Sequence, residues 1–235
     1  MESNQRLRHS VLLIGASRGL GYAMAEEFLK RDWDVIGTVR ASAHTALHAL
    51  AERVPGRVQI ETLDVTVAEQ MGGLRARLAG RRLDLLFVNA GVTNDPRETI
   101  GEVSTEVFVR VRVTNALGPM RAVERIGGLV TEDGLIEVMS SGQGSIGNNT
   151  NGQRELYGGS KAALDMLMRS FALRHALDRR ARVLRAPRWV RTERGGPDAR
   201  LSIAESIPKG LKTLRAARTR PGLQYLDDSG RTVPW

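Results

Sequence analysis

Tyr157 and Lys161 lie four residues apart in the segment Tyr157-Gly158-Gly159-Ser160-Lys161, near the expected start of a helix. Residues i and i+4 share one face of a helix, so the phenol and the ammonium group can lie side by side. A phenol has a pKa of about 10, and a neighbouring ammonium charge favours its ionised form. Tyr157 is therefore a candidate general acid toward a carbonyl oxygen, or a general base toward an alcohol. Such a pair is common in helices and does not by itself establish a site.

A glycine-rich turn, Gly15-Ala16-Ser17-Arg18-Gly19-Leu20-Gly21, follows the first apolar run and precedes a helical pattern. Glycine lets the backbone approach a ligand closely, and the amino end of a helix offers N–H groups to a pyrophosphate. The spacing is G-x-x-x-G-x-G, which differs from the general dinucleotide fingerprint G-x-G-x-x-G. We expect cofactor contacts from Gly15, Ser17, Arg18, Gly19, Leu20 and Gly21.

The end of the second expected strand predicts which dinucleotide is bound. It reads Thr38-Val39-Arg40, and no acidic residue occurs between positions 37 and 51. Enzymes specific for NAD place an acid near this point, whereas an Arg nearby accommodates the 2′-phosphate of NADP. Arg18 can reach the same corner, and two guanidinium groups offer charge-assisted hydrogen bonds to a phosphate. The sequence therefore predicts NADP(H).

Short apolar runs alternate with helical patterns along the chain. We expect strands at 11–14, 35–39, 58–63, 83–88, 134–139, 183–186 and 224–226. We expect helices at 20–30, 43–53, 67–78, 104–126 and 156–177, and a last helix opened by the capping box Ser202-x-x-Glu205. Apolar strands separated by helices predict an α/β fold with a three-layer, doubly wound parallel sheet of about seven strands. Ligands in such a fold bind at the carboxyl ends of the strands.

The ordered set of motifs resembles the short-chain dehydrogenase/reductase family over nearly the whole chain. It comprises Gly15-x-x-x-Gly19-x-Gly21, Leu63-Asp64-Val65, Asn89-Ala90-Gly91, Asn115, Ser140-Ser141 and Tyr157-x-x-x-Lys161. Segments 140–148, 189–192, 195–197 and 233–235 resemble the sniffer-like carbonyl reductases and their C-factor relatives. The resemblance implies a single Rossmann-type domain over 1–235, with a substrate lid around 192–210.

The family resemblance also implies a catalytic set. Tyr157 would exchange the proton, and Ser141, rather than Ser140, would polarise the carbonyl of a small carbonyl or alcohol substrate. Asn115 would hold a water molecule in a proton relay to Lys161. A homodimer or homotetramer is implied as well. The further cofactor contacts implied are Asp64, Val65, Asn89, Ala90, Gly91, Tyr157, Lys161, Pro187, Val190 and Thr192.

Several residues depart from the family pattern. Pro187-Arg188 replaces the usual Pro-Gly beside the nicotinamide, and Pro208 is expected to kink the last helix. Arg182, Arg185 and Glu137 occur in expected strands, where an unpaired buried charge is costly. We hypothesise an ion pair between Arg185 and Glu137 on neighbouring strands. These departures keep open the alternative of a catalytically weak or inactive NADP-binding regulator on the same fold.

Composition excludes other classes of protein. The chain has 235 residues and a net charge of +9, from 35 basic residues, of which only four are Lys, and 26 acidic ones. Aromatic residues make up 4%, which leaves little material for base stacking, so we do not expect a nucleic-acid partner. The absence of Cys fits a cytoplasmic location. No apolar run at the amino end is long enough for a membrane span, and His44 and His48 lack a third ligand for a metal.

Overall fold

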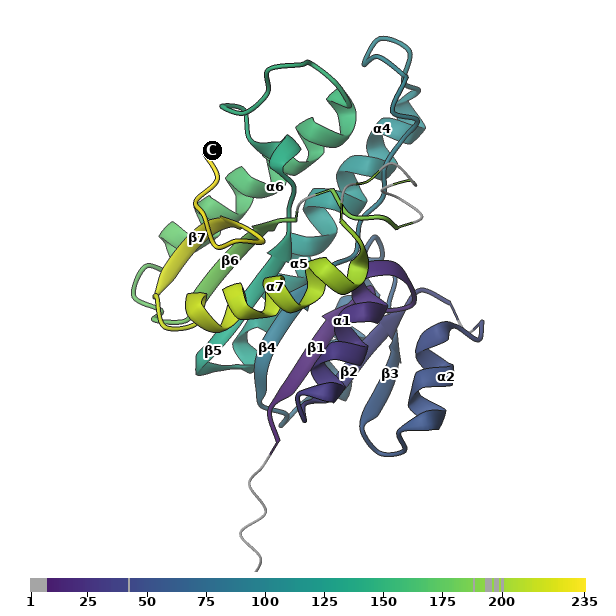
Figure 1. The fold of residues 1–235 in the computed structure, drawn as a ribbon, viewed down its shortest axis with the longest axis vertical. Coiled ribbons are helices and arrows are strands. Elements are labelled where there is room, and N and C mark those ends of the chain that lie inside the picture. The colour runs from purple at the N-terminus through teal and green to yellow at the C-terminus, as the bar shows by residue number, and fades with distance from the viewer. Residues whose placement is uncertain (1–7, 42, 188, 193–195, 197–198, 200) are drawn as a thin grey trace, which may run out of the picture.

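A seven-stranded parallel sheet forms the centre of the protein, in the order β3-β2-β1-β4-β5-β6-β7. The structure, a computed structural model shown in Figure 1, describes residues 8–41, 43–187, 189–192, 196, 199 and 201–235. The strands are β1 (Ser10–Ile14), β2 (Asp34–Val39), β3 (Val58–Thr62), β4 (Leu83–Val88), β5 (Val130–Met139), β6 (Ala181–Ala186) and β7 (Gly222–Asp227).

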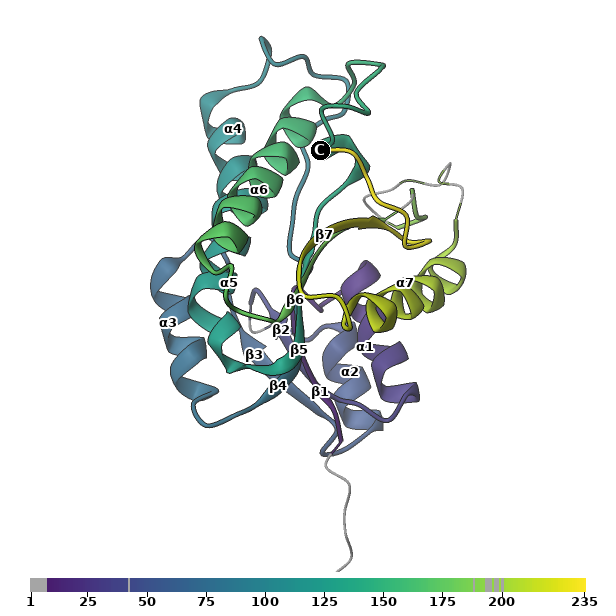
Figure 2. The ribbon, with the colours of Figure 1, turned by 90° about the vertical axis from the view of Figure 1, so that its left-hand side faces the viewer.

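Helices cover both faces of the sheet, as Figure 2 shows. On one face lie α1 (Gly19–Lys30), α2 (Ala46–Arg53) and α7 (Ile203–Ala217). On the other lie α3 (Ala68–Arg77), α4 (Thr105–Arg112), α5 (Gly118–Ile126) and α6 (Glu155–Arg174). The predicted three-layer, doubly wound α/β fold is confirmed. The capping box at Ser202 and Glu205 is present, and α7 runs through Pro208 without a break.

The helix expected over 104–126 is divided. A π-helical turn, Val113–Leu117, separates α4 from α5, and a 3₁₀ turn, Gly127–Leu129, follows α5. Single π-helical turns inside helices often mark functional sites. Here the turn carries Asn115, which is fully buried.

Strand residues alternate between the two faces, and this alternation separates the unusual charges of β5 and β6. Leu184 and Ala186 pack toward α5 and α6, whereas Ala181 and Val183 pack toward α1 and α7. Arg185 and Glu137 therefore point under α7, where they form the hypothesised ion pair. Arg182 points toward α6, where it pairs with Asp178 at 2.7 Å and lies over the Phe171 ring at 5.6 Å.

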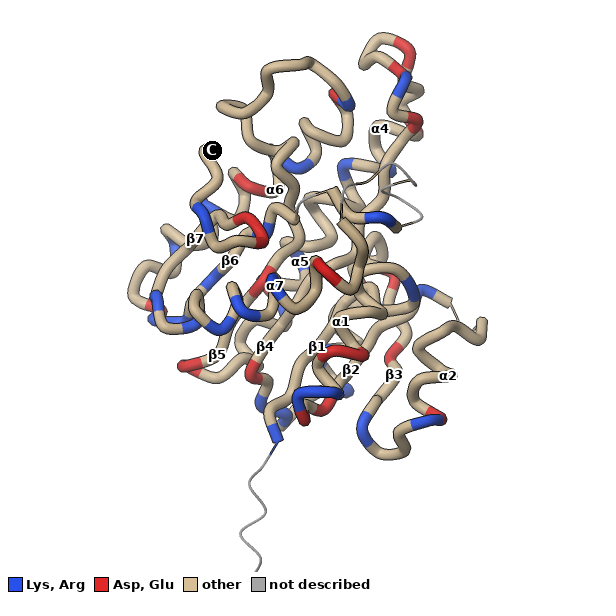
Figure 3. The backbone as a smooth tube through the Cα atoms, in the orientation of Figure 1, with Lys and Arg blue, Asp and Glu red and all other residues tan. Residues whose placement is uncertain are grey.

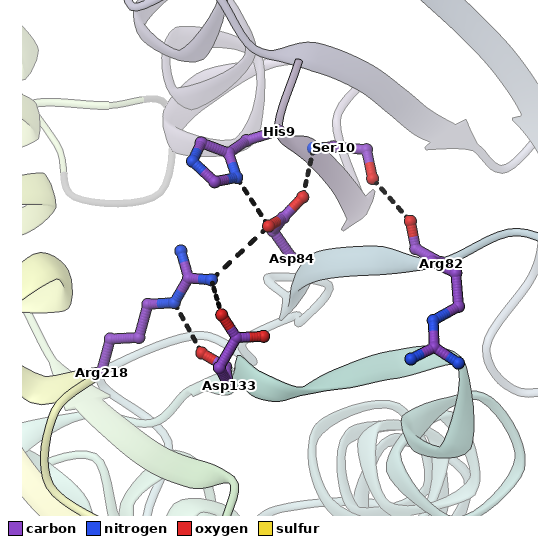
Figure 4. A network of polar contacts seen from close by, with 6 residues as sticks. All are labelled: His9, Ser10, Arg82, Asp84, Asp133 and Arg218. Carbon is purple, nitrogen blue, oxygen red and sulfur yellow. Dashed lines mark hydrogen bonds and ion pairs between the residues drawn. The ribbon is translucent and has the colours of Figure 1, made fainter. Parts of the chain in front are cut away.

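A polar network fastens the amino ends of β1, β4 and β5 to the end of α7 (Figure 4). Asp84 accepts a hydrogen bond from the Ser10 N–H at 2.9 Å, contacts the His9 ring at 2.6 Å and pairs with Arg218 at 3.5 Å. Arg218 also donates to the Asp133 carbonyl at 2.6 Å. This network thus ties together the amino-terminal ends of these strands, which are opposite to their carboxyl ends.

Basic and acidic residues are interspersed over most elements (Figure 3). Several Arg side chains pair with acids on the surface, including Arg31 with Glu27 at 2.9 Å and Arg174 with Glu124 at 2.5 Å. The excess of Arg is thus accommodated in part by local ion pairs, which contribute little to stability individually. Among the described helices, none is long and apolar enough to cross a membrane.

Candidate active site

The order of the strands reverses between β1 and β4, which leaves a crevice at their carboxyl ends. The glycine-rich turn leaves β1 there, and Asn89 follows β4. The Asn89 side chain donates to the Gly15 carbonyl at 2.8 Å, and the Gly15 N–H donates to the Thr38 hydroxyl at 2.9 Å. The structure therefore brings together the predicted residues after β1, β2 and β4 at one place.

The glycines of this turn are required by geometry. Gly15 has a φ of +88°, and a Cβ there would lie 2.9 Å from the Ala90 backbone. A Cβ on Gly21 would lie only 2.1 Å from the Gly15 carbonyl oxygen. Gly19 has a φ of +58°, with no atom of the described chain within 4 Å of its Cβ position. The turn is thus packed tightly on its inner side and open at Gly19.

The open side of the turn has the properties of an anion site. Among the described residues, no side chain caps the amino end of α1, and its first turn has no acidic residue. Backbone N–H groups and the helix dipole at such an end favour a phosphate. Arg18 and Arg40 are both exposed there. These residues fit a phosphorylated dinucleotide.

Asp64 lies close to the same corner. Its carboxylate accepts hydrogen bonds from the Thr66 hydroxyl at 2.7 Å and the Thr66 N–H at 2.8 Å. These bonds, chiefly that of the hydroxyl, hold the pKa of Asp64 below its usual value, and the charge of Arg40 contributes. Val65, the residue that follows Asp64, is buried.

Tyr157 and Lys161 lie in the first turns of α6, as the spacing predicted. The Lys161 ammonium is 5.9 Å from the centroid of the Tyr157 ring and donates to the Met139 carbonyl at 2.7 Å. Lys161 is buried and Tyr157 is half-buried. The ammonium charge therefore lies beside the phenol in a place of limited solvent access, where its influence is enhanced.

Ser140 and Ser141 have different environments. Ser140 is buried, and its hydroxyl donates to Asp165 at 2.5 Å. Ser141 is half-buried and begins the 3₁₀ turn Gly142–Gly144, where its hydroxyl accepts the Gln143 N–H at 3.2 Å. Ser141 is thus less buried than Ser140, and its role in holding the substrate stays a prediction.

Two glycines allow this 3₁₀ turn to lie directly on α6. A Cβ on Gly158 would be 2.9 Å from the Gln143 carbonyl oxygen, and a Cβ on Gly144 would be 2.9 Å from the Lys161 Cβ. The turn that begins at Ser141 therefore packs on the part of α6 that carries Tyr157 and Lys161.

Asn115 fastens two parts of the site to each other. Its side-chain oxygen accepts the Val92 N–H at 2.8 Å, and its amide donates to the Val92 carbonyl at 2.8 Å and to the Ser160 hydroxyl at 2.9 Å. Through these bonds, the loop after Gly91 is held against α6. The side-chain oxygen and amide of Asn115 already have these protein partners, and the water-binding role expected of this residue stays a prediction.

An open cavity of about 420 Å³ lies where β6 and β7 end. Its walls include Gly142, Asn148 and Pro187, together with Arg231 and Val233 of the carboxyl-terminal segment. Farther along the chain, Val190 is buried and forms a bridge with Leu201, and the Thr192 backbone carbonyl accepts the Gly196 N–H at 2.9 Å. The departure at Arg188 and positions 193–195, 197, 198 and 200 of the expected lid lie outside the described residues.

Sequence reasoning missed two residues of the site. Asp165 and Tyr225 both contact the segment that carries Ser140 and Ser141. Asp165 follows Lys161 by one helical turn on the buried face of α6, and this spacing could have revealed it. Tyr225 comes from the last strand, and no local pattern places it near Ser141. Within the described part of the chain, no cluster of possible metal ligands occurs.

Comparison with known proteins decides the family. A family model described as enoyl-(acyl carrier protein) reductase matches residues 15–199. The chain belongs to the short-chain dehydrogenase/reductase family. Among curated members, the C-signal protein of Myxococcus xanthus is 33% identical over 155 residues, which cover 65% of this chain and 93% of that protein.

Solved short-chain dehydrogenase/reductase structures match over almost the entire chain. One from Burkholderia multivorans with bound NADP is 65% identical with a TM-score of 0.95, covering 97% of this chain and all of the other. A carbonyl reductase from Pseudomonas aeruginosa PAO1, in complex with NADP, is 33% identical with a TM-score of 0.87 and the same coverage. The prediction of NADP(H) is supported by these two structures.

Proposed function

We propose that the protein is an NADP(H)-dependent oxidoreductase that interconverts a small carbonyl compound and the corresponding alcohol. The main support is the placement of Tyr157 and Lys161 on one face of α6, against the turn that begins at Ser141. The open glycine turn with Arg18 and Arg40, and the NADP in similar structures, support the choice of cofactor.

When bound, NADPH supplies a hydride to the carbonyl carbon. The Ser141 hydroxyl donates a hydrogen bond to the carbonyl oxygen and orients it. The Tyr157 phenol gives that oxygen a proton, so that the carbonyl becomes an alcohol. The buried Lys161 ammonium stabilises the phenolate that remains on Tyr157, which regains its proton from solvent. In the opposite direction, the phenolate takes the proton from the alcohol.

The carboxyl-terminal segment forms one wall of the substrate site in this proposal. The cavity after β6 and β7 has apolar walls at Ala186, Pro187, Val233 and Pro234, and its polar groups are Asn148, Asp227, Arg231 and Thr232. Such a mixture suits a carbonyl compound with an apolar body. A homodimer or homotetramer and a cytoplasmic location remain part of the proposal.

Oxidation of NADPH in the presence of para-nitrobenzaldehyde, followed by the absorbance of the reduced nicotinamide, tests this function. Tyr157→Phe removes the proton donor and keeps the ring, so turnover should fall by about 10²–10⁴-fold. Binding of NADPH, measured by its fluorescence, should change little. Full turnover by the variant would contradict the role of Tyr157. NADPH binding without turnover of a broad panel of aldehydes and ketones would favour a non-catalytic regulator.

A further inference from the structure

Three consecutive residues at the end of β5 are each fastened by a different side chain. The Met139 carbonyl accepts from Lys161 at 2.7 Å, the Ser140 hydroxyl donates to Asp165 at 2.5 Å, and the Ser141 carbonyl accepts from the Tyr225 hydroxyl at 2.6 Å. Lys161 and Asp165 are one turn apart on α6, whereas Tyr225 lies in β7. The backbone before the Ser141 hydroxyl is therefore held from two elements.

We propose that Asp165 and Tyr225 are positioning residues, which fix the Ser141 hydroxyl through a buried network of Ser140, Asp165 and Tyr225. The inference rests on the proposed function, because it assigns these residues to the orientation of the group that holds the substrate oxygen. Neither residue is given a contact with substrate or cofactor.

Burial indicates that this network is built to be rigid. Ser140, Asp165 and Tyr225 are 1%, 4% and 2% exposed. The Tyr225 ring is packed 5.4 Å from the Trp235 ring, which Arg169 covers at 4.9 Å. A hydroxyl held in this way cannot rotate freely toward water, so its bond to the Ser141 carbonyl persists. The Gly144 N–H donates to the same carbonyl at 2.9 Å and closes the turn.

The space around Asp165 is equally restricted. A Cβ on Gly144 would lie 2.6 Å from one of its carboxylate oxygens, so only glycine lets the turn approach α6 so closely. The Asp165 carboxylate thus fills the space between the turn and the helix. A buried carboxylate needs donors, and the Ser140 hydroxyl is one of them.

The titratable groups that face Asp165 are Lys161 on its own helix and Tyr225 on β7, with Tyr157 one turn beyond Lys161. Burial raises the pKa of Asp165 to about 6, although the hydroxyls of Ser140 and Tyr225 and the Lys161 charge oppose this rise. Burial also raises the pKa of Tyr225, so Tyr225 remains a hydrogen-bond donor at neutral pH. Protonation of Asp165 would weaken its hold on Ser140, because the acceptor loses its charge.

The three tyrosines of the chain provide a matched experiment. Each Tyr→Phe variant loses one hydroxyl and keeps the ring. The substrates are NADPH and para-nitrobenzaldehyde. Tyr225→Phe should lower kcat by about 10–100-fold, the loss expected when a reacting group is displaced by about an ångström. The affinity for NADPH should stay within about twofold, because the glycine turn is untouched. Tyr22→Phe, whose hydroxyl contacts Glu26 and Arg53 on the surface, should behave as wild type.

A second variant tests the charge on the network. In the wild type, kcat should decline as the pH falls through about 6, which is the pKa of Asp165. In Asp165→Asn, kcat should be lower at neutral pH, and this decline should disappear. If Tyr225→Phe does not fold, Ser140→Ala takes its place in the same assay, with thermal midpoints as the check on folding.

The outcomes distinguish a failure of the proposed function from a failure of the positioning role of Asp165 and Tyr225. A wild-type chain that binds NADPH without turnover overturns the proposed function and this inference together. An active wild type with kcat values for Tyr225→Phe and Asp165→Asn within about twofold of its own overturns the inference alone. Equal loss of kcat and of NADPH affinity in Tyr225→Phe would also overturn it, because a general structural role has that effect.

Discussion

Replacement of Arg185 should destabilise the protein more than any surface substitution. Its guanidinium pairs with Glu137, donates to the Gly210 carbonyl at 2.8 Å and lies 3.4 Å from Asp228. The side chains of Arg185 and Glu137 are 5% and 0% exposed. Arg185→Met keeps much of the apolar stem and removes the charge. Because two buried carboxylates then lack their cation, the free energy of unfolding should fall by about 3–5 kcal/mol.

The double variant separates the ion pair from its surroundings. Glu137→Met alone leaves Arg185 with Asp228, which also accepts the Ser206 hydroxyl at 3.1 Å. Replacing both partners of a buried pair by apolar residues is often nearly neutral. The sum of the losses in the free energy of unfolding for the two single variants should therefore exceed the loss for the double variant by about 3 kcal/mol, as measured by urea unfolding. Additivity within about 0.5 kcal/mol would refute the reasoning.

The same cluster gives Arg185→Met a dependence on pH. Burial raises the pKa of Glu137 above its ordinary value of 4.5, and the Arg185 charge opposes the rise. Without Arg185 the rise is unopposed, so the folded form binds a proton more tightly than the unfolded form does. The neutral Glu137 carboxyl stabilises the folded variant at pH values below its ordinary pKa of 4.5. This stability is lost as the pH rises through the higher pKa that Glu137 has in the folded form. The variant should therefore be closer to wild type at about pH 5 than at about pH 8; an equal or larger loss at the lower pH would contradict this.

Three shorter predictions concern the cofactor, the glycine turn and assembly. Arg40→Ala should raise the Kd for NADPH by about 10–100-fold and leave that for NADH within about twofold; calorimetry giving equal losses would refute the phosphate contact. Gly21→Ala, whose Cβ would lie 2.1 Å from the Gly15 carbonyl oxygen, should cost about 1–3 kcal/mol in unfolding, whereas Gly72→Ala in open space should be stabilising. Met166, 63% exposed on α6, is a candidate interface residue, and Met166→Glu should lower the mass found by light scattering; an unchanged mass would place the interface elsewhere.

The fold was accessible from the sequence because its signals are local. Apolar runs bounded by turn residues predicted all seven strands, and β4 has the expected bounds, 83–88. The boundaries that differ depend on long-range pairing. The start of β5 is one example. Val130 pairs with Leu83 before a register shift, and the polar residues 131–133 that follow Val130 hide the strand in the sequence. The π-helical turn at Asn115 is another, because the sequence there continues a helical pattern.

The site was partly accessible for the same reason. The glycine turn and the Tyr157–Lys161 pair are contained in short segments, so their geometry follows from the local structure. The contacts of Ser141, in contrast, do not follow from the local structure. Its carbonyl is held by Tyr225, 84 residues away, and the neighbouring Ser140 by Asp165, 25 residues away. The spacing from Lys161 gives a local signal for Asp165, but a single sequence contains none for Tyr225, since that contact depends on which strand the fold places beside Ser141.

Two of the departures from the family pattern, Arg185 and Glu137, lie on the α7 side of the sheet, whereas Arg188, which suggested a non-catalytic protein, lies outside the described residues. Arg185 and Glu137 project toward α7, on the face of the sheet opposite to α6, which carries Tyr157 and Lys161. Arg185 pairs with Glu137 and donates to the Gly210 carbonyl, so this cluster joins α7 to the sheet. An Arg in β6 is thus compatible with an intact catalytic face, because alternate strand residues serve different layers. The charge cluster bears on how firmly α7 is held, and the α6 side bears on turnover.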